Sequence, residues 1–190
     1  MNIIIIGPQG SGKSSQAKLL AEHLNLSYLS TGEMNRRIRE EDSKLGRKVR
    51  SLYDQGILTP DDDMLEILKS ELGKLVNAKG FVLDGYPRNV WQAKNAPFEV
   101  DEVFYLKVSD AEGIKRLMKR AQKERRVDDT KEVIGKRLEI YHRETEPVLD
   151  FYRDQGVLEE VDGERPIKEI FADILSRLSR DPNQEPGSCG

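Results

Sequence analysis

Cysteine and histidine are scarce in this chain of 190 residues. The single cysteine is Cys189, next to the last residue, and there are two histidines. One cysteine excludes an internal disulfide framework and a cysteine-rich zinc site, so we expect no zinc. His23 and His142 fall in stretches with helical periodicity, and we expect them to be surface or packing residues rather than catalysts.

Long hydrophobic runs and an excess of one charge are also missing. No apolar stretch reaches the roughly 20 residues of a transmembrane helix, and the opening MNIIII is too short for a signal peptide and lacks a basic leader. Lys and Arg number 31 against 34 Asp and Glu, a formal net charge of -3. This balance argues against a general nucleic-acid coat. We therefore expect a cytoplasmic protein that binds neither membranes nor nucleic acid.

Short apolar runs alternate with amphipathic stretches along most of the chain. The runs at 3–6, 81–83 and 103–106 are typical of buried strands, and 157–161 is a weaker candidate. Apolar stripes with helical spacing occur at 17–24, 65–76, 114–121 and 167–178. This alternation predicts an α/β fold of three layers, with a central parallel β-sheet flanked by helices.

The helix expected from 65–76 has its start signal at Thr59-Pro60-Asp61, a cap followed by a first-turn proline. No linker or internal repeat divides the chain. We expect one domain at 1–180 and a loose tail at 181–190, which has no apolar stripe.

Residues 7–14, GPQGSGKS, match the pattern GxxxxGK[ST] and lie between the first strand and an amphipathic helix. In such a loop, glycines let backbone N–H groups turn inward, and the helix N-terminus favours anions. Lys13 would then reach the β- and γ-phosphates, and Ser14 or Ser15 would place a hydroxyl near Mg²⁺. A plain glycine-rich turn is the alternative, but it does not account for the Lys-Ser pair. We predict that this phosphate-binding loop binds ATP or GTP.

The strand at 81–83 is followed by DGYPR at 84–88, and the NKxD base-reading motif of signalling GTPases does not occur. Asp84 stands where a carboxylate at a strand end can hold Mg²⁺ or its waters. A buried structural aspartate is the alternative.

Arginines follow several of these motifs. Guanidinium groups bind phosphate oxygens in pairs and stay charged, and a reaction between two phosphorylated molecules needs several of them. The candidates are Arg36, Arg88, Arg116, Arg120, Arg126 and Arg137. Arg116 or Arg126 taken alone could equally be a solvated surface residue.

The basic stretch at 115–126 has a second interpretation, contact with RNA or an acidic membrane surface. Its apolar stripe favours docking on the protein core instead. It also lacks the interleaved aromatic residues that stack on bases.

Taken in order along the chain, these motifs closely resemble those of the adenylate kinase family. The matching segments are 7–13 with Gln16, 30–34 (STGEM), 83–88 (LDGYPR) with Gln92, 126–129 (RVDD), 136–138 (KRL) and 146–148 (EPV). They cover nearly everything before the tail. The resemblance implies a P-loop kinase fold, a monomer, and reversible Mg²⁺-dependent transfer of the ATP γ-phosphoryl group to AMP, giving two ADP.

The resemblance also implies a role for each matching residue. The residues implied to bind ATP are Gly10, Ser11, Gly12, Lys13, Ser14, Ser15, Arg116, Arg120 and Arg165, with Arg116 stacked on the adenine. Those implied to bind AMP are Thr31, Arg36, Ile57, Leu58, Thr59, Gly85, Tyr86, Pro87, Arg88, Gln92, Arg126 and Arg137. The catalytic residues would be Lys13, Arg88, Arg126 and Arg137, and Asp84 with Ser14 would hold Mg²⁺, Asp84 through water.

Two mobile covers would exclude water from the reaction, an insertion at 30–59 over AMP and a short lid at 120–127 over ATP. The short lid lacks the long β-rich insertion of other family members. Glu33 stands where the family usually has Asp, and Ser14-Ser15 replaces the usual Gly-Thr. The second change leaves open which hydroxyl serves the phosphates.

Two other functions compete with this interpretation. A pyrimidine monophosphate kinase would share the fold, but Thr31 and Gln92 favour adenine, because the amide of Gln92 offers a donor and an acceptor to a purine edge. Related pyrimidine kinases tend to carry Ala and Asn there, and Asn89 is a mild likeness to them. A nucleotide-binding regulator or RNA-associated NTPase would not need the complete set of arginines.

Overall fold

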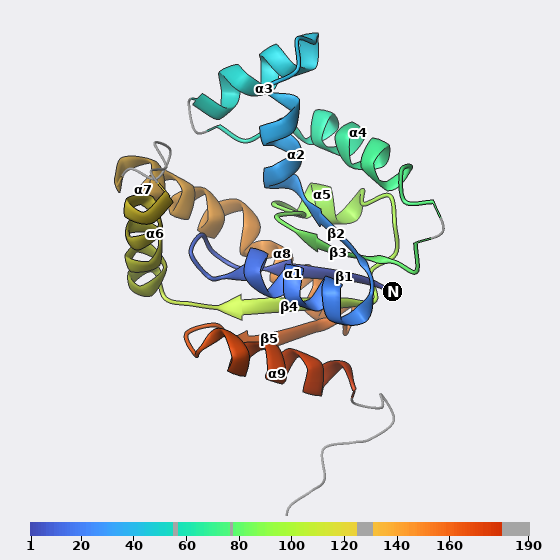
Figure 1. Cartoon of the computed structure of the whole chain (residues 1–190), viewed down its shortest axis with the longest axis vertical. Coiled ribbons are helices and arrows are strands. Elements are labelled where there is room, and N and C mark those ends of the chain that lie inside the picture. The colour runs from blue at the N-terminus through green and yellow to red at the C-terminus, as the bar shows by residue number, and fades with distance from the viewer. Residues whose placement is uncertain (55–56, 77, 125–130, 180–190) are drawn as a thin grey trace, which may run out of the picture.

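The computed structural model describes residues 1–54, 57–76, 78–124 and 131–179 (Figure 1). Arg126, the end of the expected lid and the expected tail with Cys189 lie outside the described residues.

In this described part of the chain, five strands form one sheet in the order β2-β3-β1-β4-β5, and all neighbouring strands are parallel. The strands are β1 (Asn2–Ile6), β2 (Ser27–Ser30), β3 (Phe81–Asp84), β4 (Glu102–Lys107) and β5 (Leu158–Asp162). The parallel sheet and four of the strands confirm the prediction. The sequence SYLS of β2 has no apolar run, and it was not predicted.

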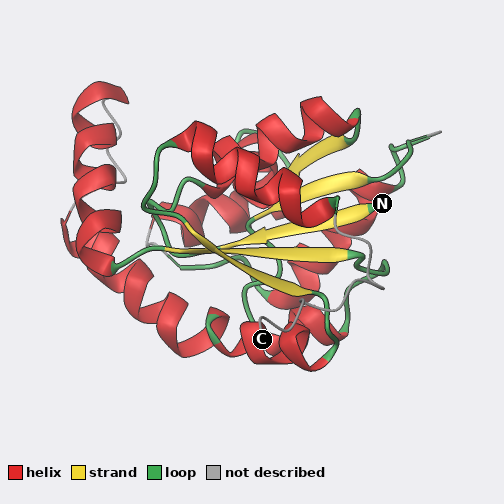
Figure 2. Cartoon of the chain, turned by 90° about the horizontal axis from the view of Figure 1, so that it is seen from below, coloured by secondary structure: helices red, strands yellow, loops and turns green. Residues whose placement is uncertain are grey.

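Helices cover both faces of the sheet, as Figure 2 shows. Ile3 and Ile5 pack with residues of α1 (Lys13–Leu24) and α9 (Ile167–Leu178) on one face. Ile4 and Ile6 point to the other face. All four isoleucines are buried, which explains why this strand is a continuous apolar run rather than an alternating one.

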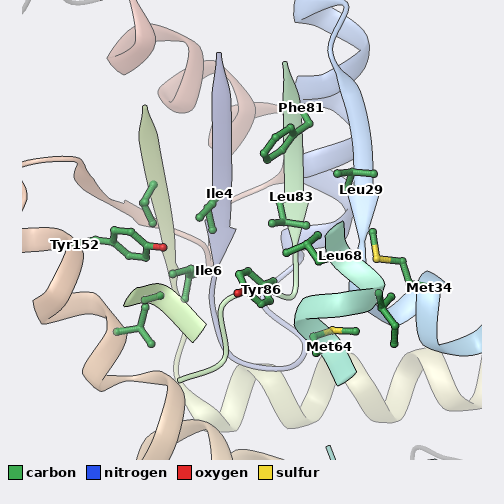
Figure 3. Close-up of a cluster of buried hydrophobic side chains, with 14 of the residues drawn as sticks. Ile4, Ile6, Leu29, Met34, Met64, Leu68, Phe81, Leu83, Tyr86 and Tyr152 are labelled. Atoms are coloured by element: carbon green, nitrogen blue, oxygen red, sulfur yellow. The ribbon is translucent and has the colours of Figure 1, made fainter. Parts of the chain in front are cut away.

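The second face holds the larger cluster of buried side chains (Figure 3). Ile4 and Leu83 of the sheet pack there with Leu68 of α4 (Asp61–Leu72), Tyr86 and Tyr152. Tyr152 belongs to α8 (Pro147–Asp154), and α5 (Val90–Lys94) lies beside α8. The core therefore holds the segment after β3 between the sheet and its covering helices.

The start predicted for α4 at residues 59–61 is confirmed, but its cap and its end were predicted wrongly. The helix begins at Asp61 with Pro60 as its N-cap, and no side chain caps it. It ends at Leu72, and Val76 is 77% exposed. Gly73 and Lys74 form a turn that ends the helix, although the apolar spacing of the sequence continues beyond it.

Two helical arms extend beyond the carboxyl end of the sheet. One consists of α2 (Thr31–Ile38) and α3 (Lys44–Asp54), which rise from β2 at the top of Figure 1. The other contains α6 (Asp110–Glu124) and α7 (Lys131–Ile140), at the left of the same view. A π-helical turn, η1 (Tyr141–Thr145), joins α7 to α8.

Candidate active site

A cavity of about 400 Å³ opens between the carboxyl ends of the strands and the two arms. This is where ligands bind in open parallel sheets. The cavity is lined by many of the residues predicted from sequence, namely Lys13, Ser14, Ser15, Arg36, Ile57, Leu58, Thr59, Asp84, Gly85, Tyr86, Pro87, Arg88, Gln92, Arg120 and Arg137.

The phosphate-binding loop has the backbone that its glycines predict. Gly10 and Gly12 have φ angles of +84° and +87°, in the left-handed region that favours glycine. A Cβ atom on Gly10 would also lie 2.4 Å from the carbonyl oxygen of Gly113 in α6. The loop is thus packed directly against the arm that carries Arg116 and Arg120. Within the loop, the predicted Ser11 is fully buried.

Lys13 is the first residue of α1, and its Nζ donates to the carbonyl oxygen of Pro8 at 3.1 Å. Desolvation of the ammonium group lowers the pKa of Lys13 to about 8. Asp84 opposes this shift, whereas Arg88 and Arg120 add to it. Loss of solvation therefore disfavours the charged form of Lys13, and a bound anion would favour it.

Ser14 and Asp84 form the contact expected of a magnesium site. Ser14 Oγ donates to Asp84 Oδ2 at 2.6 Å, and the hydroxyl of Tyr28 donates to the same oxygen at 3.4 Å. Asp84 Oδ1 is buried without a hydrogen-bond partner. A buried carboxylate oxygen without a partner is costly unless a cation or ordered water satisfies it. The donor set therefore fits Mg²⁺, held by Asp84 and Ser14 with water.

Among the described residues there is no cluster of three or more His, Cys, Asp or Glu side chains that could hold a metal ion. Within the same ranges, no helix has the length and apolar character needed to cross a membrane.

The other side of the cavity is built on the turn after β3. Thr31 Oγ1 and Arg88 Nε both donate to the carbonyl oxygen of Gly85, at 2.8 and 2.9 Å. Gly85 has a φ of +83°, and a Cβ there would lie 2.6 Å from Thr31 Oγ1. Thr31 is itself fully buried. Thr145 Oγ1 donates to the carbonyl of Arg88 at 2.8 Å, so η1 holds the backbone of this arginine.

Arg116 and Arg165 lie outside the residues that line the cavity. Arg116 donates to Glu112 and to the carbonyl oxygens of Gly163 and Glu164, which joins α6 to the loop before α9. Arg165 pairs with Asp173 of α9 at 2.5 Å. Arg116 of α6 therefore contacts the loop that contains Arg165, and each arginine is paired with a carboxylate of a helix, Glu112 of α6 or Asp173 of α9. Arg126, which sequence places in the site, lies outside the described residues.

Sequence reasoning missed several cavity residues. Tyr28 contacts Asp84, and burial together with that carboxylate raises the pKa of its hydroxyl. Glu33 forms an ion pair of 2.9 Å with Lys18, which links α2 to α1. These contacts join distant segments, and no local pattern marks them. Thr145 stands directly before the motif at 146–148 and could have been found from it.

Comparison with known proteins identifies a matching family and similar chains. The family model described as adenylate kinase matches residues 5–157. The adenylate kinase of Maricaulis maris is 40% identical over 185 residues, which are 94% of this chain and 98% of that protein. Those of Bifidobacterium longum and Mycobacterium bovis are also 40% identical, over 94% and 95% of this chain and the whole of each relative.

Proposed function

Because the chain belongs to the adenylate kinase family, we propose that the cavity between its two arms is the active site. The reaction is transfer of a phosphoryl group from ATP to AMP, giving two ADP. What we propose is which residues carry it out, and how.

The phosphate-binding loop takes the triphosphate of ATP. Backbone N–H groups of residues 10–15 surround the phosphates at the N-terminus of α1, where the helix dipole favours anions. Lys13 and Arg120 supply charge from the two walls of the cavity. Arg116 and Arg165 flank the adenine, where the loop before α9 meets α6.

AMP occupies the opposite half of the cavity. Its phosphate contacts Arg36 and Arg88, and its base and ribose lie against the backbone of residues 57–59 and 85–87, with Thr31 supporting the turn. The amide of Gln92 binds the adenine edge, since one primary amide offers both a donor and an acceptor.

Transfer requires alignment and charge neutralisation rather than a general base. A phosphate monoester is already largely dianionic near neutral pH, so AMP can attack without losing a proton. Lys13, Arg88 and Arg137, with Arg126, neutralise the negative charge on the oxygens of the transferred phosphoryl group in the transition state. Mg²⁺, held by Asp84 and Ser14 with water, neutralises charge on the ATP phosphates when it is bound.

Exclusion of water depends on the arms. Residues 30–59 cover AMP and residues 120–127 cover ATP, and closure of both prevents hydrolysis of ATP. Together with the sheet they form one domain at 1–180. We further propose that the enzyme acts as a cytoplasmic monomer on ATP and AMP, without nucleic acid.

One observation carries the assignment. Lys13, Arg88, Arg120 and Arg137 line a single cavity although they come from four separate segments of the chain. Clustered cations create a positive potential that attracts anions. Two nucleotides that meet end to end supply those anions.

An acceptor panel tests the proposal. Purified enzyme with Mg²⁺ and ATP is given AMP, CMP, UMP, GMP or no acceptor, and the diphosphates are quantified. We expect diphosphate from AMP far above the others. Faster CDP or UDP formation would identify a pyrimidine monophosphate kinase, and loss of ATP without acceptor would identify an NTPase.

A matched pair of variants tests the cavity itself. Arg137→Ala should lower turnover by about 10³ or more, the scale of an arginine that acts on the transferred phosphoryl. Arg143→Ala is the control, because Arg143 is exposed nearby and pairs with Glu144. Equal effects of the two substitutions would contradict the assignment.

A further inference from the structure

The side-chain amide of Gln92 is held at both of its ends. Its Oε1 accepts from the backbone N–H of Arg88 at 2.8 Å, and its Nε2 donates to Asp61 Oδ1 at 2.7 Å. Gln92 is 3% exposed and lines the cavity. Asp61 is the first residue of α4, and its only role so far is as part of the start signal of that helix.

These two partners fix which end of the amide is oxygen and which is nitrogen. A reversed amide would direct its NH₂ group at the N–H of Arg88, donor against donor. It would also direct its carbonyl oxygen at the carboxylate of Asp61, acceptor against acceptor. Such unsatisfied contacts raise the free energy of a buried polar group strongly. The orientation therefore follows from chemistry as well as from geometry.

Asp61 is itself held in place. Asn89 Nδ2 donates to both of its carboxylate oxygens, at 2.9 and 3.0 Å. Asn89 Oδ1 accepts from the backbone N–H of Gln92 at 2.8 Å and caps α5, so the amide of Asn89 cannot reverse either. The carboxylate also lies in the first turn of α4, where the helix dipole favours negative charge.

An amide held in one orientation presents only one arrangement of hydrogen-bond donor and acceptor to a purine. A primary amide has two N–H donors and two acceptor lone pairs. Asp61 uses one donor and Arg88 uses one lone pair, which leaves one donor and one acceptor for the ligand. Adenine offers the complement, an acceptor at N1 and an amino donor at C6. Hypoxanthine and guanine carry N1–H and a 6-oxo group, and they would need the amide reversed.

We propose that Asp61 is a specificity-determining residue, which prevents reversal of the Gln92 amide so that the AMP side of the cavity rejects 6-oxopurine monophosphates. Asp61 acts through Gln92 and is a positioning residue. The inference rests on the proposed role of Gln92 at the adenine edge.

The test compares AMP with IMP as acceptor. The ratio of their kcat/KM values is measured for the wild type, for Asp61→Asn and for Asp62→Asn. Asp61→Asn replaces one carboxylate oxygen by an NH₂ donor and so weakens one of the two contacts that oppose reversal of the Gln92 amide, the other being the N–H of Arg88. The ratio of AMP to IMP should therefore fall by roughly tenfold or more. Asp62→Asn makes the same charge change at the next, exposed position and should leave the ratio unchanged.

The ratio separates specificity from a loss of structure. Both acceptors are measured on one preparation, so the folded fraction cancels. An equal fall for AMP and IMP would mean that Asp61 is merely structural and would overturn the proposal. If Asp61→Asn does not fold, Asp61→Ser supplies a hydroxyl that can donate as well as accept and therefore imposes no orientation on the amide of Gln92. That variant should lower the ratio as well, and an unchanged ratio would overturn the proposal.

Gln92→Leu distinguishes the proposed role of Asp61 from the proposed role of Gln92 on which it rests. If Gln92 reads adenine, the variant loses most discrimination between AMP and IMP. Loss in Gln92→Leu with an unchanged ratio in Asp61→Asn would overturn the role of Asp61 alone. An unchanged ratio in Gln92→Leu would overturn the role of Gln92 and, with it, that of Asp61.

Discussion

Binding of ATP should draw a proton from solution at pH 8, because the ammonium group of Lys13 lies in a desolvated, cationic site. Its pKa is lowered to about 8, so about half of the molecules have a neutral amine at that pH. The triphosphate brings several negative charges against the amine and raises its pKa again. We expect an uptake of about 0.5 proton per ATP at pH 8, about 0.1 at pH 7 and about 0.9 at pH 9.

The sign of the affinity change follows from the same linkage. Since the protonated form binds the phosphates, the ATP association constant is highest below the pKa of the free enzyme. It should fall by roughly twofold at pH 8 and roughly tenfold at pH 9, relative to its value near neutral pH. At pH 8 and 9 the terminal phosphate of ATP does not interfere, because a phosphate with a pKa of about 6 is already ionised there.

Calorimetric titration in two buffers of different ionisation enthalpy measures the uptake directly, with ATP and without Mg²⁺. Lys18→Gln is the matched control, since Lys18 also lines the cavity but pairs with Glu33, and its uptake should equal that of the wild type. Lys13→Gln should abolish the uptake. Equal uptake in Lys13→Gln and wild type, or less than about 0.2 proton in the wild type at pH 8, would refute the reasoning.

Three further outcomes are expected. Arg88→Ala should lower turnover by roughly 10³ or more, measured as ADP formation; a folded variant with near wild-type turnover would contradict its role. Gly113→Ala places a Cβ 2.8 Å from the carbonyl of Gln9; it should raise the KM for ATP by about tenfold while that for AMP is unchanged, and equal changes would count against it. The carboxylates on either side of His142 raise its pKa above 6.5. The contribution of His142 to the free energy of unfolding is therefore fully present below pH 6.5 and is lost as pH rises through the folded-state pKa. In His142→Gln, the free energy of unfolding measured with urea should lack this pH dependence.

The phosphate-binding loop and the buried strands could be predicted because their physical causes are local. Residues 7–14 carry the glycines, lysine and serine that bind phosphate, in the order that the chemistry requires. The run at 3–6 is apolar on both faces because helices cover both faces of the sheet. Because residues 7–14 directly follow this strand, the sequence placed the loop between the first strand and the helix after it.

Contacts between distant segments could not be predicted in this way. The hydrogen bond from Gln92 to Asp61 joins residues 31 positions apart, and nothing near Asp61 in the sequence indicates its partner. Tyr28 reaches Asp84 only because β2 and β3 pair in parallel register. The stripe through Val76 shows the opposite error, because apolar spacing can continue after a turn has ended the helix.

The partners of the cations suggest an order in which the two halves of ATP engage. Lys13 Nζ donates to the neutral carbonyl oxygen of Pro8, which is a weaker partner than a phosphate oxygen. Arg116 and Arg165 instead pair with the carboxylates of Glu112 and Asp173. A phosphate can replace a carbonyl without leaving a carboxylate unpaired, whereas movement of either outer arginine toward ATP must first break an ion pair. The triphosphate should therefore engage Lys13 before the adenine engages Arg116 and Arg165, and the cost of freeing those two arginines should weaken adenine binding more than phosphate binding.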